Sequence, residues 1–345
     1  MRHPDTRRRE LVPTAAGTIT RLAYARLREA RTNVTPLLRK SGLTLSQIDD
    51  PNTRVSVRNQ INFLKLAAKE LNDDLLGFHL AQSFDLREMG FLYYVASSSE
   101  MLTLALQRAA RYSSIINEGV SIKYVDSKDV TMAFHYVGVS RHKDRQQIEF
   151  FITALVLLCR KLTGLQMVPS NLSLTHRRSD KCSELCEFFG TDVNFGAPVD
   201  EVTFAPSTRE IPVISADPYL NKLLIANFDA ALSRRPTNRR SFHSSVENAL
   251  VPLLPHGKVR MSEIARMLGM SQRSLARRLS SEGLNFSELL DNLRADLADR
   301  YLAEESLSIT QIAWLLGYQE VSALTHAFRR WTGTTPREAR LQIVS

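Results

Sequence analysis

Cysteine is scarce in this chain of 345 residues, which contains three, Cys159, Cys182 and Cys186. Three thiols are too few for the disulfide framework on which small secreted domains depend. The N-terminus has no apolar stretch of the kind that a signal peptide requires. The longest apolar run, residues 150–159, has about half of the ~20 residues that a membrane span needs. We therefore expect a soluble cytoplasmic protein that has no membrane partner.

The motifs of common enzyme and metal sites are missing as well. The sequence contains no phosphate-binding Gly-rich loop, no Gly-x-Ser-x-Gly and no His-Glu-x-x-His. Cys182 and Cys186 would lie one turn apart on a helix, with His176 upstream, but no fourth ligand follows at a suitable spacing. We expect no metal and no cofactor, and we interpret these cysteines as buried thiols.

The positive charge is distributed unevenly. The formal net charge of +9 favours polyanionic partners without identifying one. Residues 1–40 hold ten Lys or Arg against three Asp or Glu, whereas the last hundred residues hold twelve against eleven. A nucleic-acid site in the C-terminal part must therefore depend on where charges lie along particular helices.

A polar segment divides the chain. Residues 234–243 contain Pro236 and four arginines, and the first apolar residue is Phe242, which is typical of a linker. Helix and strand patterns are mixed before it, and only helix patterns follow it. We predict an α+β domain over residues 1–233 and an all-α domain over residues 244–345.

Periodicity predicts the main elements of the first domain. The pattern Ser97-x-x-Glu100 is typical of a capping box and predicts the start of a long helix that carries Leu102 and Ile116. Alternation on both sides of a polar turn predicts a β-hairpin over 120–137. Further helices are predicted over 55–71, 144–162 and 217–233, and short strands over 172–175 and 199–204.

The helices of the second domain are clearly delimited. Four glycines fall just after apolar-periodic runs, where helices end: Gly269, Gly283, Gly317 and Gly333. Ser308 with Gln311, and Thr335 with Glu338, form two capping-box patterns. Local chemistry and hydrophobic period therefore agree on where these helices begin and end.

The second domain also contains an internal repeat. Residues 261–270 recur as 309–318, so that Ile264, Ala265, Leu268 and Gly269 match Ile312, Ala313, Leu316 and Gly317. Further along, Leu275 and Leu279 match Leu324 and Phe328. Each copy reads as a short helix, a glycine turn and a second helix, which is the pattern of a helix-turn-helix motif. We predict two such motifs, over about 261–283 and 309–333.

A helix over 286–302 joins the two copies. Its 17 residues span about 26 Å at ~1.5 Å per residue. Adjacent major grooves on one side of B-DNA lie about 34 Å apart. A rigid connector of this length suits two recognition helices in successive grooves.

Candidate DNA contacts lie on the second helix of each motif. Ser271 can cap the first of these helices and donate to a phosphate, Gln272 suits adenine, and Arg273 or Arg277 suits guanine. The predicted contacts on this helix are Ser271, Gln272, Arg273, Ser274, Arg277 and Arg278, of which Arg278 suits the DNA backbone. In the second motif, the predicted contacts are Gln319, Ser322 and His326, with Arg329 and Arg330 nearer the phosphates.

Other roles remain open for part of this surface. The alternative to DNA contact for the second recognition helix is that it braces the domain or contacts a polymerase subunit. We interpret Trp314 and Trp331 as core or helix-packing residues rather than base-stacking platforms.

The signature of these residues resembles the AraC/XylS family of transcription regulators. It consists of Ile312-Ala-x-x-x-Gly-Tyr318, Ser322-x-Leu324-x-x-x-Phe328-Arg329-Arg330 and Gly333-x-x-Pro336-x-x-Ala339-Arg340. Residues 76–81, 98–106 and 195–198 resemble the arabinose-binding-type domain of the ornithine-utilisation regulator subgroup. The chain departs from the family at Thr325-His326, where serine and arginine are usual.

The resemblance implies a sequence-specific regulator, often an activator, that binds double-stranded promoter DNA. It implies an N-terminal domain that senses a small effector or forms a homodimer, and RNA polymerase as a further partner. The effector-binding residues are not identified by the sequence.

Two other functions are alternatives to this one. A DNA-repair alkyl-transfer enzyme with an AraC-like module would need an activated cysteine. Cys159 lies in an apolar run, which raises the pKa of a thiol, and no Pro-Cys-His-Arg element accompanies Cys182 or Cys186. We therefore expect no enzyme. The other alternative is a helical protein-interaction module that does not bind DNA.

Overall fold

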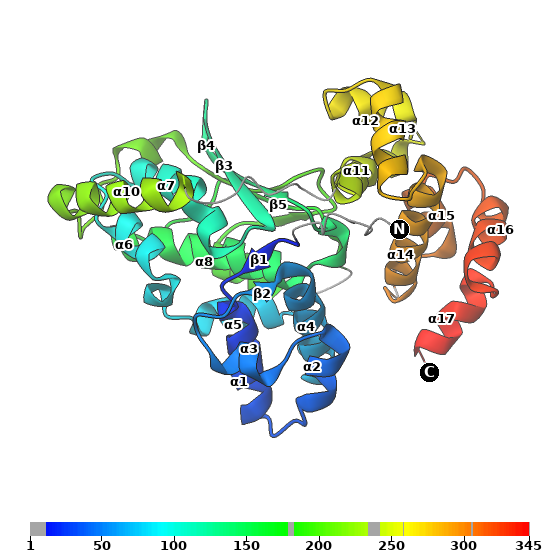
Figure 1. Cartoon of the computed structure of the whole chain (residues 1–345), viewed down its shortest axis with the longest axis horizontal. Coiled ribbons are helices and arrows are strands. Elements are labelled where there is room, and N and C mark those ends of the chain that lie inside the picture. Colours follow the sequence, from blue (N-terminus) through cyan, green and yellow to red (C-terminus); the bar gives the residue numbers. More distant parts are fainter. Residues whose placement is uncertain (1–11, 179–182, 234–241, 258, 305, 345) are drawn as a thin grey trace, which may run out of the picture.

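The computed structural model describes residues 12–178, 183–233, 242–257, 259–304 and 306–344. Figure 1 shows a larger N-terminal body, which contains a β-sheet, and a C-terminal body made of helices. The α+β and all-α predictions for the two parts are both confirmed. Residues 234–241 of the predicted linker lie outside the described residues, and Phe242 and His243 begin a helix.

A five-stranded sheet forms the centre of the N-terminal body, in the order β3-β4-β7-β5-β6. Its strands are β3 (Val120–Asp126), β4 (Val130–Tyr136), β5 (Asn171–Leu174), β6 (Val193–Phe195) and β7 (Asp200–Phe204). The predicted hairpin is the antiparallel pair β3–β4, in which Val120 lies opposite Tyr136. Strand β6, which pairs in parallel with β5, was not predicted because three partly exposed residues carry no periodic signal.

Helices cover this sheet and build a second layer beside it. They are α1 (Thr18–Glu29), α2 (Thr35–Ser41), α3 (Leu45–Asp49), α4 (Val57–Glu70), α5 (Leu76–Ser83), α6 (Phe91–Ser97), α7 (Leu102–Ile116), α8 (Gln146–Thr163), α9 (Ser183–Phe189) and α10 (Pro218–Ser233). Short 3-10 helices are η1 (Leu86–Met89), η2 (Arg141–Lys143) and η3 (Pro206–Glu210), and a two-stranded ladder pairs β1 (Thr14–Ala15) with β2 (Val55–Ser56).

Helix α8 lies between two hydrophobic cores. Its Ile148, Ile152 and Val156 pack with the sheet and α7. Its Phe150 and Ala154 pack with the helical layer that includes α1, α4 and α5. Both faces of α8 are therefore buried, which explains why its sequence is a nearly continuous apolar run.

The predicted capping box before α7 is wrong. Ser97 is the last residue of α6, and its hydroxyl donates to the carbonyl of Tyr94. The N-cap of α7 is Met101, which has extended backbone, makes an isolated bridge with Pro212 and provides no side-chain cap. A long-range strand contact therefore sets the start of α7, and a local pattern could not reveal it.

The C-terminal body is organised around α14 (Phe286–Leu302), whose bounds match the predicted connector. The other elements are α11 (Phe242–Leu250), η4 (Val251–His256), α12 (Met261–Met267), α13 (Gln272–Ser281), α15 (Ile309–Leu315), α16 (Val321–Thr332) and α17 (Pro336–Val344). The buried Leu289, Leu293 and Leu297 of α14 lie in one core with both helix pairs. The capping boxes at Ser308 and Thr335 are confirmed.

The two tryptophans have different surroundings. Trp331 is partly buried and lies edge-on to the ring of Phe328, 6.5 Å between centroids, as a helix-packing residue. Trp314 is 55% exposed, so its assignment to the core or to helix packing is wrong. It occupies the outward side of α15, where the first copy of the repeat carries Arg266.

Candidate nucleic-acid interface

The turn of the first motif follows from its glycine and its N-cap. Gly269 lies just after α12 with φ +65°, which is the left-handed conformation that glycine tolerates best. Ser271 then caps α13, its Oγ accepting the backbone N–H of Ser274 at 3.2 Å. Ala265 is buried at the crossing of the two helices. These features hold α13 at a fixed angle to α12.

Helix α13 presents its cationic side chains to solvent. Leu275 and Leu279 are fully buried in the core, while Gln272, Arg273 and Arg277 are exposed. The side chains of Arg273 and Arg277 form no ion pair or hydrogen bond with the part of the chain that the structure describes. Two uncompensated guanidinium groups are therefore available on one helix face.

Arg278 has a different environment. Its guanidinium carbon lies 4.4 Å from the centroid of the Phe242 ring at the start of α11. This cation–π contact packs the base of α13 against α11. Arg278 remains exposed, so a phosphate at the edge of a groove would be within its reach more readily than a base.

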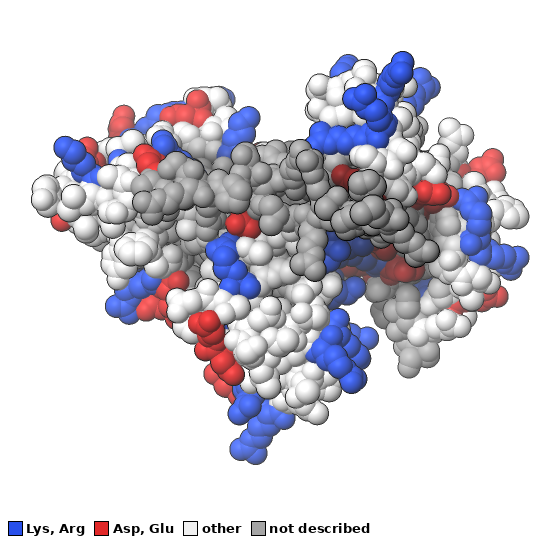
Figure 2. Space-filling view, in the orientation of Figure 1, with Lys and Arg blue, Asp and Glu red and all other residues white. Residues whose placement is uncertain are grey.

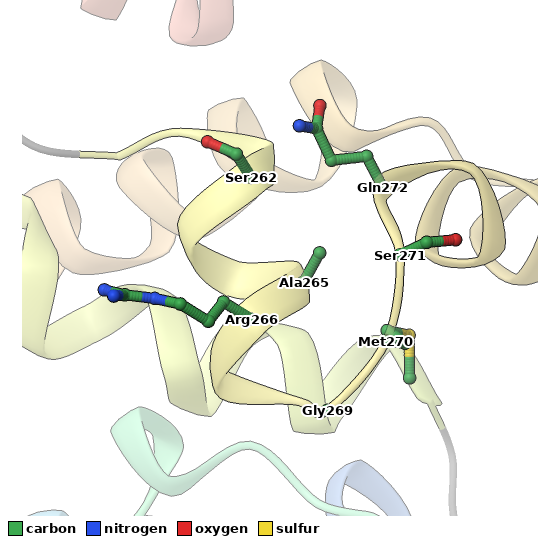
Figure 3. Close-up of a pocket in the computed structure, with 7 residues that line it drawn as sticks. All are labelled: Ser262, Ala265, Arg266, Gly269, Met270, Ser271 and Gln272. Carbon is green, nitrogen blue, oxygen red and sulfur yellow. The ribbon is translucent and has the colours of Figure 1, made fainter.

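Ser262 and Arg266 of α12 were not among the predicted contacts, but the structure places them beside Ser271 and Gln272. Together with Ala265, Ser271 and Gln272 they line an open concavity between the two helices. Figure 3 shows Ser262 and Gln272 projecting from their helices toward the same side. The helical position of these residues was the available signal, because the first helix of a helix-turn-helix motif crosses the DNA backbone.

The second motif repeats the glycine turn and the buried helix face, but the N-cap of α16, Glu320, makes no side-chain cap. Gly317 has φ +81° between α15 and α16, and Leu324 and Phe328 of α16 are buried. The outward side chains include Gln319, Ser322, His326, Arg329 and Arg330, all of them exposed. Arg330 pairs with Asp291 of α14 at 2.8 Å, so its charge is already compensated.

Basic side chains gather over the first motif. In Figure 2, Lys and Arg side chains cluster at the upper right, over α12 and α13. The exposed arginines of these helices are Arg266, Arg273, Arg277 and Arg278. Placement, rather than bulk charge, therefore gives this nearly neutral part of the chain a cationic face.

The N-terminal body contacts the C-terminal one through the segment that carries η2. The backbone N–H of Arg141 donates to Oδ1 of Asn248 on α11 at 2.8 Å. The Asn248 amide donates in turn to the carbonyl of Val139 at 3.2 Å. Lys143 pairs with Asp296 on α14 at 2.7 Å. One short segment therefore contacts both α11 and the connector helix.

Buried charges hold η2 in place. The guanidinium of Arg141 is bidentate to Asp200 of β7, with 2.6 Å between Nη2 and Oδ1. His176 accepts from Arg141 and contacts Glu149 of α8 at 2.7 Å.

Burial lowers the pKa of His176 to about 4, against the opposing effect of Glu149. Burial raises the pKa of Glu149, but His176 and Arg178 outweigh it and bring that pKa to about 2.

Alternative chemistry has little support among the described residues. Burial raises the pKa of the Cys159 thiol to about 12, which is opposite to what a nucleophile requires. Cys182 lies outside the described residues, and Cys186 is partly exposed. The described part of the chain has no cluster of three metal-ligating side chains. Its helices also include none with the length and apolarity that a bilayer crossing demands.

The tandem motifs define a DNA-binding protein of the helix-turn-helix class. Residues 264–342 match the family described as a helix-turn-helix domain. Residues 32–213 match the family described as the arabinose-binding domain of AraC transcription regulator, at the N-terminal side. The chain therefore belongs to the AraC family of transcription regulators.

Relatives extend along most of the chain. The HTH-type transcriptional regulator VirS of Mycobacterium tuberculosis is 28% identical over 331 residues, 91% of this chain and 92% of that protein. The ornithine utilization regulator of Pseudomonas aeruginosa is 26% identical over 85% of this chain and 86% of its own length. The crystal structure of transcriptional regulator CdpR from Pseudomonas aeruginosa is 21% identical, with a TM-score of 0.41 over 91% of this chain and 98% of that chain. The matched families and relatives are transcription regulators rather than enzymes.

Proposed function

We propose that this regulator binds one side of a promoter duplex with both motifs and activates transcription in response to a small effector. The observation that carries the DNA contact is the state of Arg273 and Arg277. They are exposed, and no described residue pairs with them, on a helix whose opposite face is fixed in the core. Free guanidinium groups on a positioned helix suit bidentate contacts with guanine.

The first motif makes most of the specific contacts in this proposal. Gln272, Arg273 and Arg277 read base edges, while Ser271, Ser274 and Arg278 contact the DNA backbone. The packing of Arg278 on Phe242 supports contact with the DNA backbone, because it holds the guanidinium near the C-terminal end of α13.

The second motif makes fewer contacts with bases. Gln319, Ser322 and His326 face the groove, and Arg329 and Arg330 lie nearer the phosphates. The pairing of Arg330 with Asp291 supports this order, because it leaves less positive charge free on α16. The exposed Trp314 of α15 suits contact with RNA polymerase. We propose that the regulator activates transcription through this contact, in the bacterial cytoplasm.

The two bodies divide the work. The DNA-binding unit begins with α11 at Phe242, two residues before the predicted start at 244, and extends to residue 345. Residues 1–233 are the effector-binding or dimerisation unit, and residues 234–241 link the two. The η2 contacts with α11 and α14 support regulation through this junction, because a shift of η2 would change how the DNA-binding unit is held. The effector must bind the two arrangements with different affinities to have this effect.

Sedimentation of the purified chain tests whether it pairs as a homodimer.

Binding-site selection from random DNA with the full chain tests the DNA contact. On the selected operator, Arg273→Ala or Arg277→Ala should cost about 1–3 kcal/mol of binding free energy. In Arg278→Ala, which removes a proposed phosphate contact, the slope of log affinity against log salt should become shallower by about 0.9. Arg26→Ala is the matched control, since it removes one exposed positive charge from the N-terminal body. Equal affinities of Arg273→Ala, Arg277→Ala and the wild-type chain would refute these two contacts. Failure of the chain to enrich any DNA sequence would favour a protein-interaction module.

Transcription in vitro tests the direction of regulation. A template with the selected operator upstream of a promoter should give more transcript when the chain is added with RNA polymerase. Trp314→Ala should lower this gain while leaving operator affinity unchanged. A decrease in transcript on adding the chain would identify a repressor.

A further inference from the structure

A partly enclosed cavity lies between the two hydrophobic cores of the N-terminal body. It has a volume of about 130 Å³ and is lined by 22 residues, 16 of which are apolar. Its walls include Ile19 of α1, Ile116 of α7, Phe134 of β4, and Phe150 and Leu155 of α8. Protein interiors are close-packed, with few voids larger than a water molecule. A space of this size at the meeting of two cores therefore requires an explanation.

The polar side chains of Gln60, Ser113 and Asn117 in the cavity lining already have hydrogen-bond partners. Nε2 of the neighbouring Gln147 is buried without one. The Gln60 amide accepts from Thr20 at 3.0 Å and donates to Gln147 at 2.7 Å. The Asn117 amide also donates to Gln147, at 3.0 Å, and accepts from the backbone N–H of Gly119. A ligand in this space would find few free hydrogen-bonding partners. A sugar is unsuitable, because its hydroxyl groups would lose water without replacement.

The charges at the cavity also restrict the ligand. Glu88 is the one charged residue in its lining, and this residue is exposed. The guanidinium of Arg21, which donates to the carbonyl of the lining Ala16 at 2.7 Å, lies beside the cavity, and Glu88 offsets its charge. An acidic ligand would therefore find no net positive charge there. In addition, an apolar cavity of about 150 Å³ engineered in another protein stays dry and binds benzene. The size and chemistry here therefore suit one six-membered ring or a short hydrocarbon chain.

We propose that this cavity is the effector site, and that it takes a small, uncharged, predominantly apolar molecule. The inference rests on the proposed function for the existence of an effector. The cavity itself, its walls and its polar edge are independent of that function.

The position of the cavity connects it to the DNA-binding unit. Gln147, which holds both amides at the cavity edge, donates its backbone N–H to Asp144 at 3.0 Å. The carbonyl of Asp144 accepts from the guanidinium of Arg141. The backbone N–H of Arg141 donates to Asn248 of α11 at 2.8 Å. A ligand that shifts α8 at the cavity therefore displaces a hydrogen-bonded chain that ends on the DNA-binding unit.

Thermal unfolding of the full chain with benzene as the probe tests occupancy. At ten times its Kd, benzene should raise the Tm by about 3–6 °C, and above the Kd the shift should grow with the logarithm of the benzene concentration. Benzoate, which adds a charge to the same ring, and arabinose should leave the Tm unchanged. The absence of a Tm shift with benzene, or an equal shift with benzoate or arabinose, would overturn the assignment.

Variants that fill the cavity provide the control. Ala154→Leu from α8, and Ala109→Leu from α7 on another wall, place added carbons in the space. Each should keep or raise the Tm without ligand and lose the benzene shift. Ala105→Leu is the matched comparison, because Ala105 is also buried but does not line the cavity. It should lower the Tm through overpacking and keep the benzene shift. A benzene shift that persists in both filled variants would overturn the proposal.

Operator affinity provides a separate readout of the effector role. Benzene should change the Kd for the selected operator in the wild-type chain and not in Ala154→Leu. Saturable binding of benzene with an unchanged Kd would refute the effector role of the cavity. Failure to bind any operator would refute the proposed function instead, and the Tm measurements would still decide whether the cavity binds benzene.

Discussion

The two turn glycines of the repeat should respond very differently to the same substitution. Gly269 and Gly317 occupy equivalent positions and both have positive φ, +65° and +81°. A Cβ added at Gly269 would meet nothing within 4 Å, whereas one added at Gly317 would lie 2.5 Å from the carbonyl oxygen of Leu254. Leu254 belongs to η4, whose backbone is packed against the second motif.

The magnitudes follow from this contrast. An alanine in the left-handed region costs about 1–2 kcal/mol relative to glycine, so Gly269→Ala should cost about that much stability. At Gly317 the same strain is present, and displacing a packed backbone adds about 1–3 kcal/mol. Gly317→Ala should therefore cost about 2–5 kcal/mol in total. A β-branched residue at this position should unfold the second motif.

Urea unfolding measured by tryptophan fluorescence is a suitable assay. Both tryptophans of the chain, Trp314 and Trp331, lie on helices of the second motif. The urea midpoint should fall about 1.5 to 4 times as far in Gly317→Ala as in Gly269→Ala, with unchanged m-values. Equal shifts would refute the reasoning, since they would mean that η4 moves aside at no cost.

Three further predictions concern buried or paired groups. Because the pKa of His176 falls from 6.5 in the unfolded chain to about 4 in the folded one, about 3 kcal/mol of stability should be lost as the pH falls from 6.5 to 4. In His176→Gln, the denaturation midpoint should depend less on pH over this range. Asp296→Asn and Lys143→Met should show a coupling energy of about 0.2–1 kcal/mol in a double-mutant cycle that shrinks with added salt, and zero coupling at low salt would argue against their contact. Cys159 should resist iodoacetamide until urea unfolds the chain, and rapid labelling of the native protein would contradict its burial.

The sequence determined the C-terminal fold almost completely. The glycine ends, the capping boxes and the span of α14 were predicted because they depend on contacts within one or two helical turns. The outward direction of Arg273 and Arg277 followed from the buried positions of Leu275 and Leu279 on the same helix. The hairpin of β3 and β4 was predicted for the same reason, since its pairing is local.

Only the tertiary structure decided the features that join distant segments. The start of α7 depends on a bridge between Met101 and Pro212, so the local capping pattern misled. The placement of Arg278 on Phe242 and the exposure of Trp314 also depend on how whole helices pack. The cavity between the two cores is built from several separate helices and strands, and the contacts of η2 with α11 and α14 join residues 107 and 154 positions apart. Hydrophobic period identifies which face of a helix is buried, but it does not specify which partner covers that face or where two packed layers leave a space.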